Sequence, residues 1–107
     1  RGLTEKVLLV ITGEFGRTPK INAKGGRDHW GNLCPLVFVG GGLKMGQVIG
    51  ESDKKGAEPI TNPITSNDLL GTIMHSLFDL GQVRTLANIP RDVQDVVGSG
   101  NPISELI

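Results

Sequence analysis

The sequence TGEFGRTPKINAKGGRDHW, residues 12–30, directly follows the apolar run VLLVI at residues 7–11. An apolar run without polar alternation predicts a buried strand, here over residues 6–12. In open α/β sheets, the loop that leaves such a strand carries ligand and catalytic groups. The long, glycine-rich loop 13–34 is therefore the candidate functional segment of this chain.

The remaining pattern predicts two more strands and one helix. Residues 36–39 and 47–50 are β-prone, and the glycines between them predict a structural turn. The glycine spacing fits neither a P-loop nor a dinucleotide fingerprint, because Gln47 and Val48 follow Gly46 and position 45 is Met. We expect the three strands 6–12, 36–39 and 47–50 to share one sheet.

The predicted helix spans about residues 67–80. Thr65 and Asp68 have the spacing of a capping box, and Gly81 is placed to end the helix in a left-handed conformation. Its apolar residues recur at helical spacing and should cover the sheet, with His75 pointing away. These apolar residues are Leu69, Leu70, Ile73, Met74, Leu77 and Phe78. Further on, residues 93–97 predict a short edge strand, and residues 103–107 form a tail that could pack on the body.

Composition excludes several classes of partner. Eleven basic residues balance eleven acidic ones, so no global field attracts nucleic acid. No apolar run approaches the roughly 20 residues of a membrane span. Cys34 is the only cysteine, which excludes an internal disulfide, and we expect it to be buried as a small hydrophobic residue.

The chain begins Arg1-Gly2 and enters a strand almost at once. We therefore expect residues 1–107 to be a single partial domain, the C-terminal fragment of a larger one. Such a fragment would leave apolar surface and strand edges uncovered, which favours self-association.

The loop carries residues of two useful kinds. Glu14, Asp28 and His29 are types that bind divalent metal ions. The basic residues are types that bind phosphate or sulfate, namely Arg17, Lys20, Lys24 and Arg27. An ordinary solvated loop is the alternative for the whole segment. For Glu14 the alternative to metal binding is an ion pair with Arg17 or Arg27 that pins the loop. We expect Trp30 to pack under the loop and to need a partner for its indole N–H.

Four motifs in this order resemble the C-terminal part of the DUF1501 family: GEFGRTP at 13–19, GRDHW at 26–30, GGGLKMGQVIG at 40–50 and GNPISEL at 100–106. These are large bacterial proteins, abundant in planctomycetes and distantly related to sulfatases and the alkaline phosphatase superfamily. The resemblance implies an α/β fold, in which this chain forms the C-terminal portion of an alkaline-phosphatase/sulfatase-like sheet with a covering helix. It also implies an exported or periplasmic location.

The superfamily comparison can be made residue by residue. Its members carry Thr-Ser-Asp-His-Gly after a strand, where the acid and the histidine bind metal, and residues 12–16 resemble that stretch. Glu14 keeps the acid, whereas Phe15 replaces the histidine, which weakens the case for two metal ions. His29 resembles a histidine that members supply from further downstream. Asp28 and His29 could instead be the adjacent pair itself, but a loop rather than a strand precedes them.

The resemblance implies a metal-dependent phosphatase- or sulfatase-like hydrolase of an anionic ester. Glu14 and His29 would bind a divalent metal (Zn, Ca or Mn), and Asp28 would orient His29 from the outer shell. Arg17, Arg27 and Lys20 would bind the anion.

The nucleophile and the first acidic ligand lie in the N-terminal part of such proteins, so we expect the fragment alone to be inactive. The alternative is a non-catalytic, degenerate member of the fold that binds an anion, a glycan or a protein.

Overall fold

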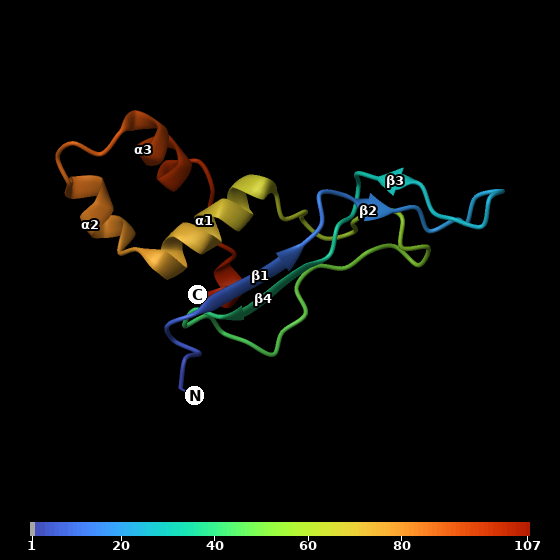
Figure 1. Ribbon diagram of the computed structural model, residues 1–107, viewed down its shortest axis with the longest axis horizontal. Helices are drawn as coiled ribbons and strands as arrows, with labels where there is room; N and C mark the ends of the chain where they lie inside the picture. Colours follow the sequence, from blue (N-terminus) through green and yellow to red (C-terminus); the bar gives the residue numbers. More distant parts are fainter. Residues whose placement is uncertain (1) are drawn as a thin grey trace. The chain divides into compact units, whose positions relative to one another are not determined.

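The computed structural model describes residues 2–107 and is a mixed helix and strand structure (Figure 1). Its strands form two separate two-stranded sheets, β1–β4 and β2–β3. Two compact units are distinguished: one of residues 2–8, 39–47 and 64–107, the other of residues 9–38 and 48–63. The elements are β1 (Leu8–Thr12), β2 (Gly16–Arg17), β3 (His29–Trp30), β4 (Leu36–Gly40), α1 (Ser66–Leu77), α2 (Leu80–Thr85), α3 (Arg91–Gly98) and the 3-10 turn η1 (Ser104–Leu106).

The first two predicted strands are confirmed as β1 and β4, which pair with each other. The third is wrong: residues 47–50, all within the described chain, follow an irregular path, and Val48 is 97% exposed. Gly46 just before this stretch and Gly50 at its end have φ of 80° and 82°, values that break an extended strand. The expected three-stranded sheet therefore has two strands.

The burial expected for strand 6–12 is also wrong. Leu9 is 50% exposed and Ile11 is 55% exposed, whereas Leu8 and Val10 are half-buried. This alternation is that of a strand with one covered face, which residue type alone did not reveal because both faces are aliphatic.

The glycine run after β4 is a structural turn, as predicted. Gly40, Gly41 and Gly42 have φ of 81°, 67° and 72°, which other residues rarely adopt. The Gly41 N–H donates to the Val7 carbonyl at 2.8 Å, and the Gly42 N–H donates to the Thr4 carbonyl at 3.3 Å. Because these N–H groups already bind carbonyls, the run does not offer them to a phosphate.

The predicted capping box at the start of α1 is confirmed. Thr65 accepts a hydrogen bond from the Asp68 N–H, and the Asp68 side chain accepts one from the Thr65 N–H at 2.9 Å. The predicted end is wrong, because α1 stops at Leu77. Asp79 then starts α2 by accepting from the Gly81 N–H at 3.0 Å, so Gly81 lies in a second helix instead of ending the first.

The buried side of α1 is rotated around the helix axis by about one residue position from the predicted apolar face. Gly71 and Thr72 are buried, whereas Leu70 is 40% exposed; His75 is exposed, as predicted. A Cβ atom at Gly71 would lie 3.1 Å from the carbonyl of Gly100, so the absence of a side chain lets the C-terminal segment cross α1 closely. The sequence pattern of large apolar residues does not report such a backbone crossing.

The C-terminal part is helical where an edge strand was predicted. Residues 93–97 lie in α3, which packs against α1 (Figure 1). Val93, Val96 and Val97 have helical spacing, and Val97 is 3% exposed, so the packing of one helical side outweighs the β-propensity of valine. The tail packs on its unit as expected, with Ile103 and Leu106 both 6% exposed. Among residues 2–107, no helix combines the length and apolar character that crossing a membrane requires.

Replacing Thr72 with valine should destabilise the helical unit. The Thr72 hydroxyl is fully buried, donates to the Asp68 carbonyl at 2.7 Å and accepts from the Ile103 N–H at 2.9 Å. Valine keeps the shape but leaves a buried N–H without a partner, which costs about 1–3 kcal/mol. Urea unfolding followed by circular dichroism at the helical wavelength measures this, because α1, α2 and α3 all lie in this unit.

Thr85→Val provides the matched control, since the Thr85 hydroxyl makes a similar bond to the Gln82 carbonyl at 2.8 Å but is exposed. Its unfolding free energy should change by less than about 0.5 kcal/mol. Equal stability of Thr72→Val and the unmodified chain would show that the C-terminal segment does not depend on this bond.

Candidate functional site

The candidate loop is closed by a short antiparallel ladder between β2 and β3. Gly16 pairs with Trp30, and Arg17 pairs with His29. Gly16 is buried, and a Cβ atom there would collide with the Leu33 carbonyl and lie 3.3 Å from the Trp30 carbonyl. The glycine in GEFGR is therefore required by close backbone approach, and the loop is more ordered than its sequence indicated.

One face of this ladder carries His29 with Phe15 and Arg17. Paired residues share a face and neighbours in sequence alternate, so Phe15 and Arg17 lie on the side of His29. The Phe15 and His29 ring centroids are 3.8 Å apart with a 30° interplanar angle, and the Arg17 guanidinium carbon is 5.4 Å from the Phe15 centroid. The imidazole and the Arg17 guanidinium therefore both lie against the Phe15 ring. We call these three residues the histidine face.

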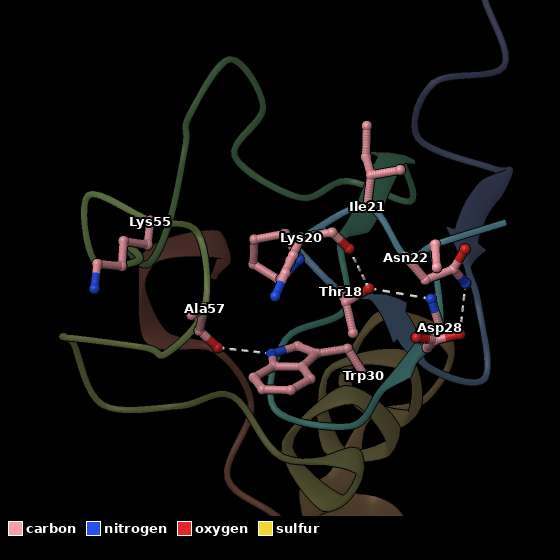
Figure 2. A pocket seen from close by; sticks show the side chains of 10 residues that line it. Thr18, Lys20, Ile21, Asn22, Asp28, Trp30, Lys55 and Ala57 are labelled. Carbon is pink, nitrogen blue, oxygen red and sulfur yellow. Dashed lines mark hydrogen bonds between the residues drawn. The ribbon is translucent and has the colours of Figure 1, made fainter. Parts of the chain in front are cut away.

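The opposite face carries Trp30, and its predicted hydrogen-bond partner is present. The indole Nε1–H donates to the Ala57 carbonyl at 2.7 Å (Figure 2). Thr18 and Asp28 continue the ladder through the Thr18 N–H, which donates to the Asp28 carbonyl at 3.0 Å. Trp30 is half-buried, so it packs under the loop as expected. We call Thr18, Asp28 and Trp30 the tryptophan face.

The Ala57 carbonyl is positioned by a tight turn at residues 53–56. The Asp53 carboxylate accepts from the Ala57 N–H at 2.7 Å, and the Asp53 carbonyl accepts from the Gly56 N–H at 2.9 Å. Gly56 has φ of 65°, which suits glycine. The hydrogen bond from the Ala57 N–H is the main cause that lowers the pKa of Asp53 below its ordinary value of 3.8. A second hydrogen bond connects the two segments, because the Asn32 amide donates to the Glu58 carboxylate at 2.6 Å.

The loop between Thr18 and Asp28 is fixed by its own polar side chains. The Asn22 side-chain oxygen accepts from the N–H groups of Lys24 and Gly26, both at 3.0 Å. The Asn22 amide nitrogen donates to the Asp28 carboxylate at 2.9 Å (Figure 2). Asp28 thus has Asn22 as its partner, and its predicted role in orienting His29 stays a prediction.

The two arginines of the loop differ in what they contact. Arg27 donates to the carbonyls of Thr18, at 2.7 Å, and of Pro19, so its guanidinium already holds the loop together. Arg17 makes only a long contact of 3.4 Å with the Arg27 carbonyl. Of the predicted anion-binding residues, Arg17 therefore keeps more of its donors free. Lys20 is exposed and lines a hollow together with the three residues of the tryptophan face.

The predicted metal ligands Glu14 and His29 are both exposed. Glu14 directly precedes the phenylalanine that stacks on His29, so both residues belong to the same end of the loop. Within residues 2–107, no group of three or more His, Cys, Asp or Glu side chains is arranged to hold a metal ion. Shared binding of one ion by Glu14 and His29 stays a prediction.

The structure also shows a hollow that the sequence did not predict. It has a volume of about 830 Å³ and opens on the tryptophan face (Figure 2). Lys55 and Ala57 contribute to it from a segment that was predicted to be only an exposed connection. The turn signature of Asp53 and Gly56 was visible in the sequence, but its docking on Trp30 was not. The lining residues are Thr18, Pro19, Lys20, Ile21, Asn22, Ala23, Asp28, Trp30, Lys55 and Ala57.

The expected burial of Cys34 is wrong, because this free cysteine is exposed. Its sulfur lies 3.3 Å from the Gly13 carbonyl and 3.7 Å from the Thr12 hydroxyl. The thiol lies against polar atoms at the end of β1. The apolar residues that follow it in the sequence did not indicate that this position is exposed to solvent.

Substituting Gly16 with alanine should loosen the loop. The new methyl group would overlap backbone atoms that cannot move independently, and overpacking of this kind costs about 1–3 kcal/mol. Trp30 is the only tryptophan, so its fluorescence should shift toward that of a hydrated indole at lower urea concentration. Gly31→Ala is the control, because a Cβ atom there has open space. Identical urea midpoints for the two variants would contradict the proposed close approach.

Acid should release Trp30 through Asp53. A lowered folded-state pKa means that the Asp53 carboxylate contributes stability above pH 3.8, which is lost as pH falls through the folded-state pKa. Trp30 fluorescence followed from about pH 5 to about pH 2 should therefore change below pH 3.8. Asp53→Asn keeps an acceptor oxygen without a titrating proton and should reduce this change. A variant curve that superimposes on that of the unmodified chain would exclude Asp53 as the cause.

Comparison with known proteins assigns the chain to a family. Over residues 1–107 the chain matches the family model described as a protein of unknown function (DUF1501). No curated protein and no solved structure matches the chain. Since the match extends over the whole chain, and the four motifs had indicated the same family, the protein belongs to the DUF1501 family.

Proposed function

We propose that this chain supplies part of the metal and anion site of a phosphatase- or sulfatase-like hydrolase with an alkaline-phosphatase-like sheet. The observation that supports this best is the histidine face. There, His29 stacks on Phe15 and is the cross-strand partner of Arg17, whose guanidinium lies over the same Phe15 ring, in the loop that leaves β1 through Glu14. A metal ligand beside an anion-binding cation is the pairing that hydrolysis of an anionic ester needs.

The metal site would have to be shared with residues outside this chain. Glu14 and His29 provide two donors, whereas a catalytic zinc site takes three protein ligands and an open position. When bound, the metal would polarise the ester and lower the pKa of an attacking hydroxyl or water. The remaining ligands and the nucleophile would come from the N-terminal remainder of the domain.

The chain's own residues would position the ester and keep the imidazole in place. Phe15 covers one face of the His29 ring and so limits its rotation. Arg17 can offer its guanidinium to two nonbridging oxygens of a phosphate or sulfate, because its single contact with a carbonyl is long. Arg27 would act indirectly, by holding the Thr18 and Pro19 carbonyls and thus the shape of the loop.

A non-catalytic binding module is the second candidate, and Phe15 favours it. In the superfamily pattern a histidine ligand stands at this position, and here an aromatic ring stacked on His29 fills it. A member of the fold altered in this way could bind an anionic ligand, glycan or protein without turning it over.

Metal content separates the two candidates. The protein expressed with the sequence that flanks this chain in its gene should copurify with a divalent metal close to stoichiometry, measured by elemental analysis. Glu14→Gln and His29→Ala should each lower that content about tenfold or more, because each removes a direct ligand. His75→Ala is the matched control, since His75 is an exposed helix residue.

Ester hydrolysis completes the test. We expect p-nitrophenyl phosphate or sulfate to be hydrolysed by the flanked protein, and not by the 107 residues alone. Metal content that is unchanged in both ligand variants would overturn the roles of Glu14 and His29. A protein that carries no metal and hydrolyses neither ester would favour the binding module.

A further inference from the structure

We infer that the hollow on the tryptophan face binds an acidic saccharide, a sugar chain that carries sulfate or carboxylate groups. The site lies on the opposite side of the β2–β3 ladder from His29 and consists of Trp30, Lys20, Lys55 and the apolar wall between them. It requires neither the metal nor the hydrolysis proposed for the histidine face.

The interior polar groups of this hollow are already engaged. The Thr18 hydroxyl donates to the Lys20 carbonyl at 2.9 Å and accepts from the Asp28 N–H at 3.0 Å. The indole N–H is bound to Ala57, and the Asn22 side chain is bound within the loop. The hollow is therefore held in shape before any ligand arrives, which lowers the entropic cost of binding.

What remains available to a ligand is carbon surface and charge. Pro19, Ile21 and Ala23 line the hollow with apolar side chains, together with the indole ring. Within residues 2–107 neither the Lys20 nor the Lys55 ammonium group has a hydrogen-bond partner, and both residues are exposed. Figure 2 shows the two lysines, which come from separate segments, around the same hollow as the indole.

This combination fits a saccharide better than a compact anion. A sugar ring presents a face of C–H groups that packs on an indole, and its hydroxyls accept from lysine or donate to a carboxylate such as that of Asp28. The hollow has about 830 Å³ and is open to solvent, which suits a segment of a longer chain whose ends extend beyond it. Lysine acts as a point charge without a preferred fork geometry, so either sulfate or carboxylate satisfies it.

Trp30 gives a local readout of binding, because it is the only tryptophan and the chain has no tyrosine. The 107-residue chain is titrated in EDTA with sulfated maltohexaose, with tri-galacturonic acid and with neutral maltohexaose, while Trp30 fluorescence is recorded. We expect the Trp30 fluorescence to change saturably with at least one of the two acidic sugars, which identifies sulfate or carboxylate as the group that the lysines bind. The neutral sugar should bind at least about tenfold more weakly.

Matched lysine variants test the site itself. Lys20→Ala and Lys55→Ala should each weaken binding about threefold, and the double variant about tenfold. Lys24→Ala and Lys54→Ala change the same charge on adjacent segments outside the hollow, so they should leave the affinity nearly unchanged. Circular dichroism and the fluorescence of the ligand-free protein confirm that each variant is folded.

Three outcomes would overturn the inference. These are the absence of saturable binding to either acidic sugar, equal loss of affinity in the hollow and control variants, and equally tight binding of the non-sugar polyanion poly(vinyl sulfate). Because metal is removed throughout, failure here leaves the hydrolase proposal intact. Binding of an acidic sugar would likewise not test whether the protein with its flanking sequence contains metal.

Discussion

The hydrogen bond from the Trp30 indole to the Ala57 carbonyl is the contact on which the candidate site depends. It joins two segments that are 27 residues apart in sequence, the β2–β3 ladder and the turn at Asp53–Gly56. At 2.7 Å and part-buried, it satisfies the one polar atom of the largest side chain in the loop. This bond therefore connects the ladder to the segment that lines the other side of the hollow.

Successive side chains of a strand point to opposite faces, so a short sequence supplies two different surfaces. Asp28, His29 and Trp30 are consecutive, yet His29 faces Phe15 and Arg17, whereas Asp28 and Trp30 face the hollow. The histidine face combines an imidazole with a guanidinium, the combination that we propose for an anionic ester. The hollow on the tryptophan face combines an indole with two ammonium groups, the combination that we propose for an acidic sugar.

Local signals were predicted well from the sequence. The capping box of Thr65 and Asp68 depends on residues three positions apart, and the aliphatic runs of β1 and β4 specify strands with little outside help. The need of Trp30 for a partner was also predictable, because a partly buried indole N–H is costly to leave unpaired. The family motifs were recognisable because they combine such positions in a fixed order.

The features that depend on backbone segments far apart in the sequence were not predicted. The identity of Ala57 as the partner of Trp30 follows from a turn far along the chain, and the turned face of α1 follows from the crossing of Gly71 by Gly100. Residues 93–97 were predicted as a strand because valine favours strands, yet packing against α1 selects a helix. Cys34 was expected to be buried because its neighbours are apolar, although side-chain exposure is set by what covers the strand.

The β2–β3 ladder presents two independent faces, and nuclear magnetic resonance tests this independence most directly. The ring signals of His29 and His75 and the indole N–H signal of Trp30 can each be assigned, since the chain has only two histidines and one tryptophan. Millimolar Zn²⁺ should shift the His29 signals while leaving Trp30 and His75 in place. Sulfated maltohexaose should shift Trp30 while leaving His29 in place. Movement of His29 and Trp30 together with either ligand, or equal movement of both histidines with zinc, would contradict the account.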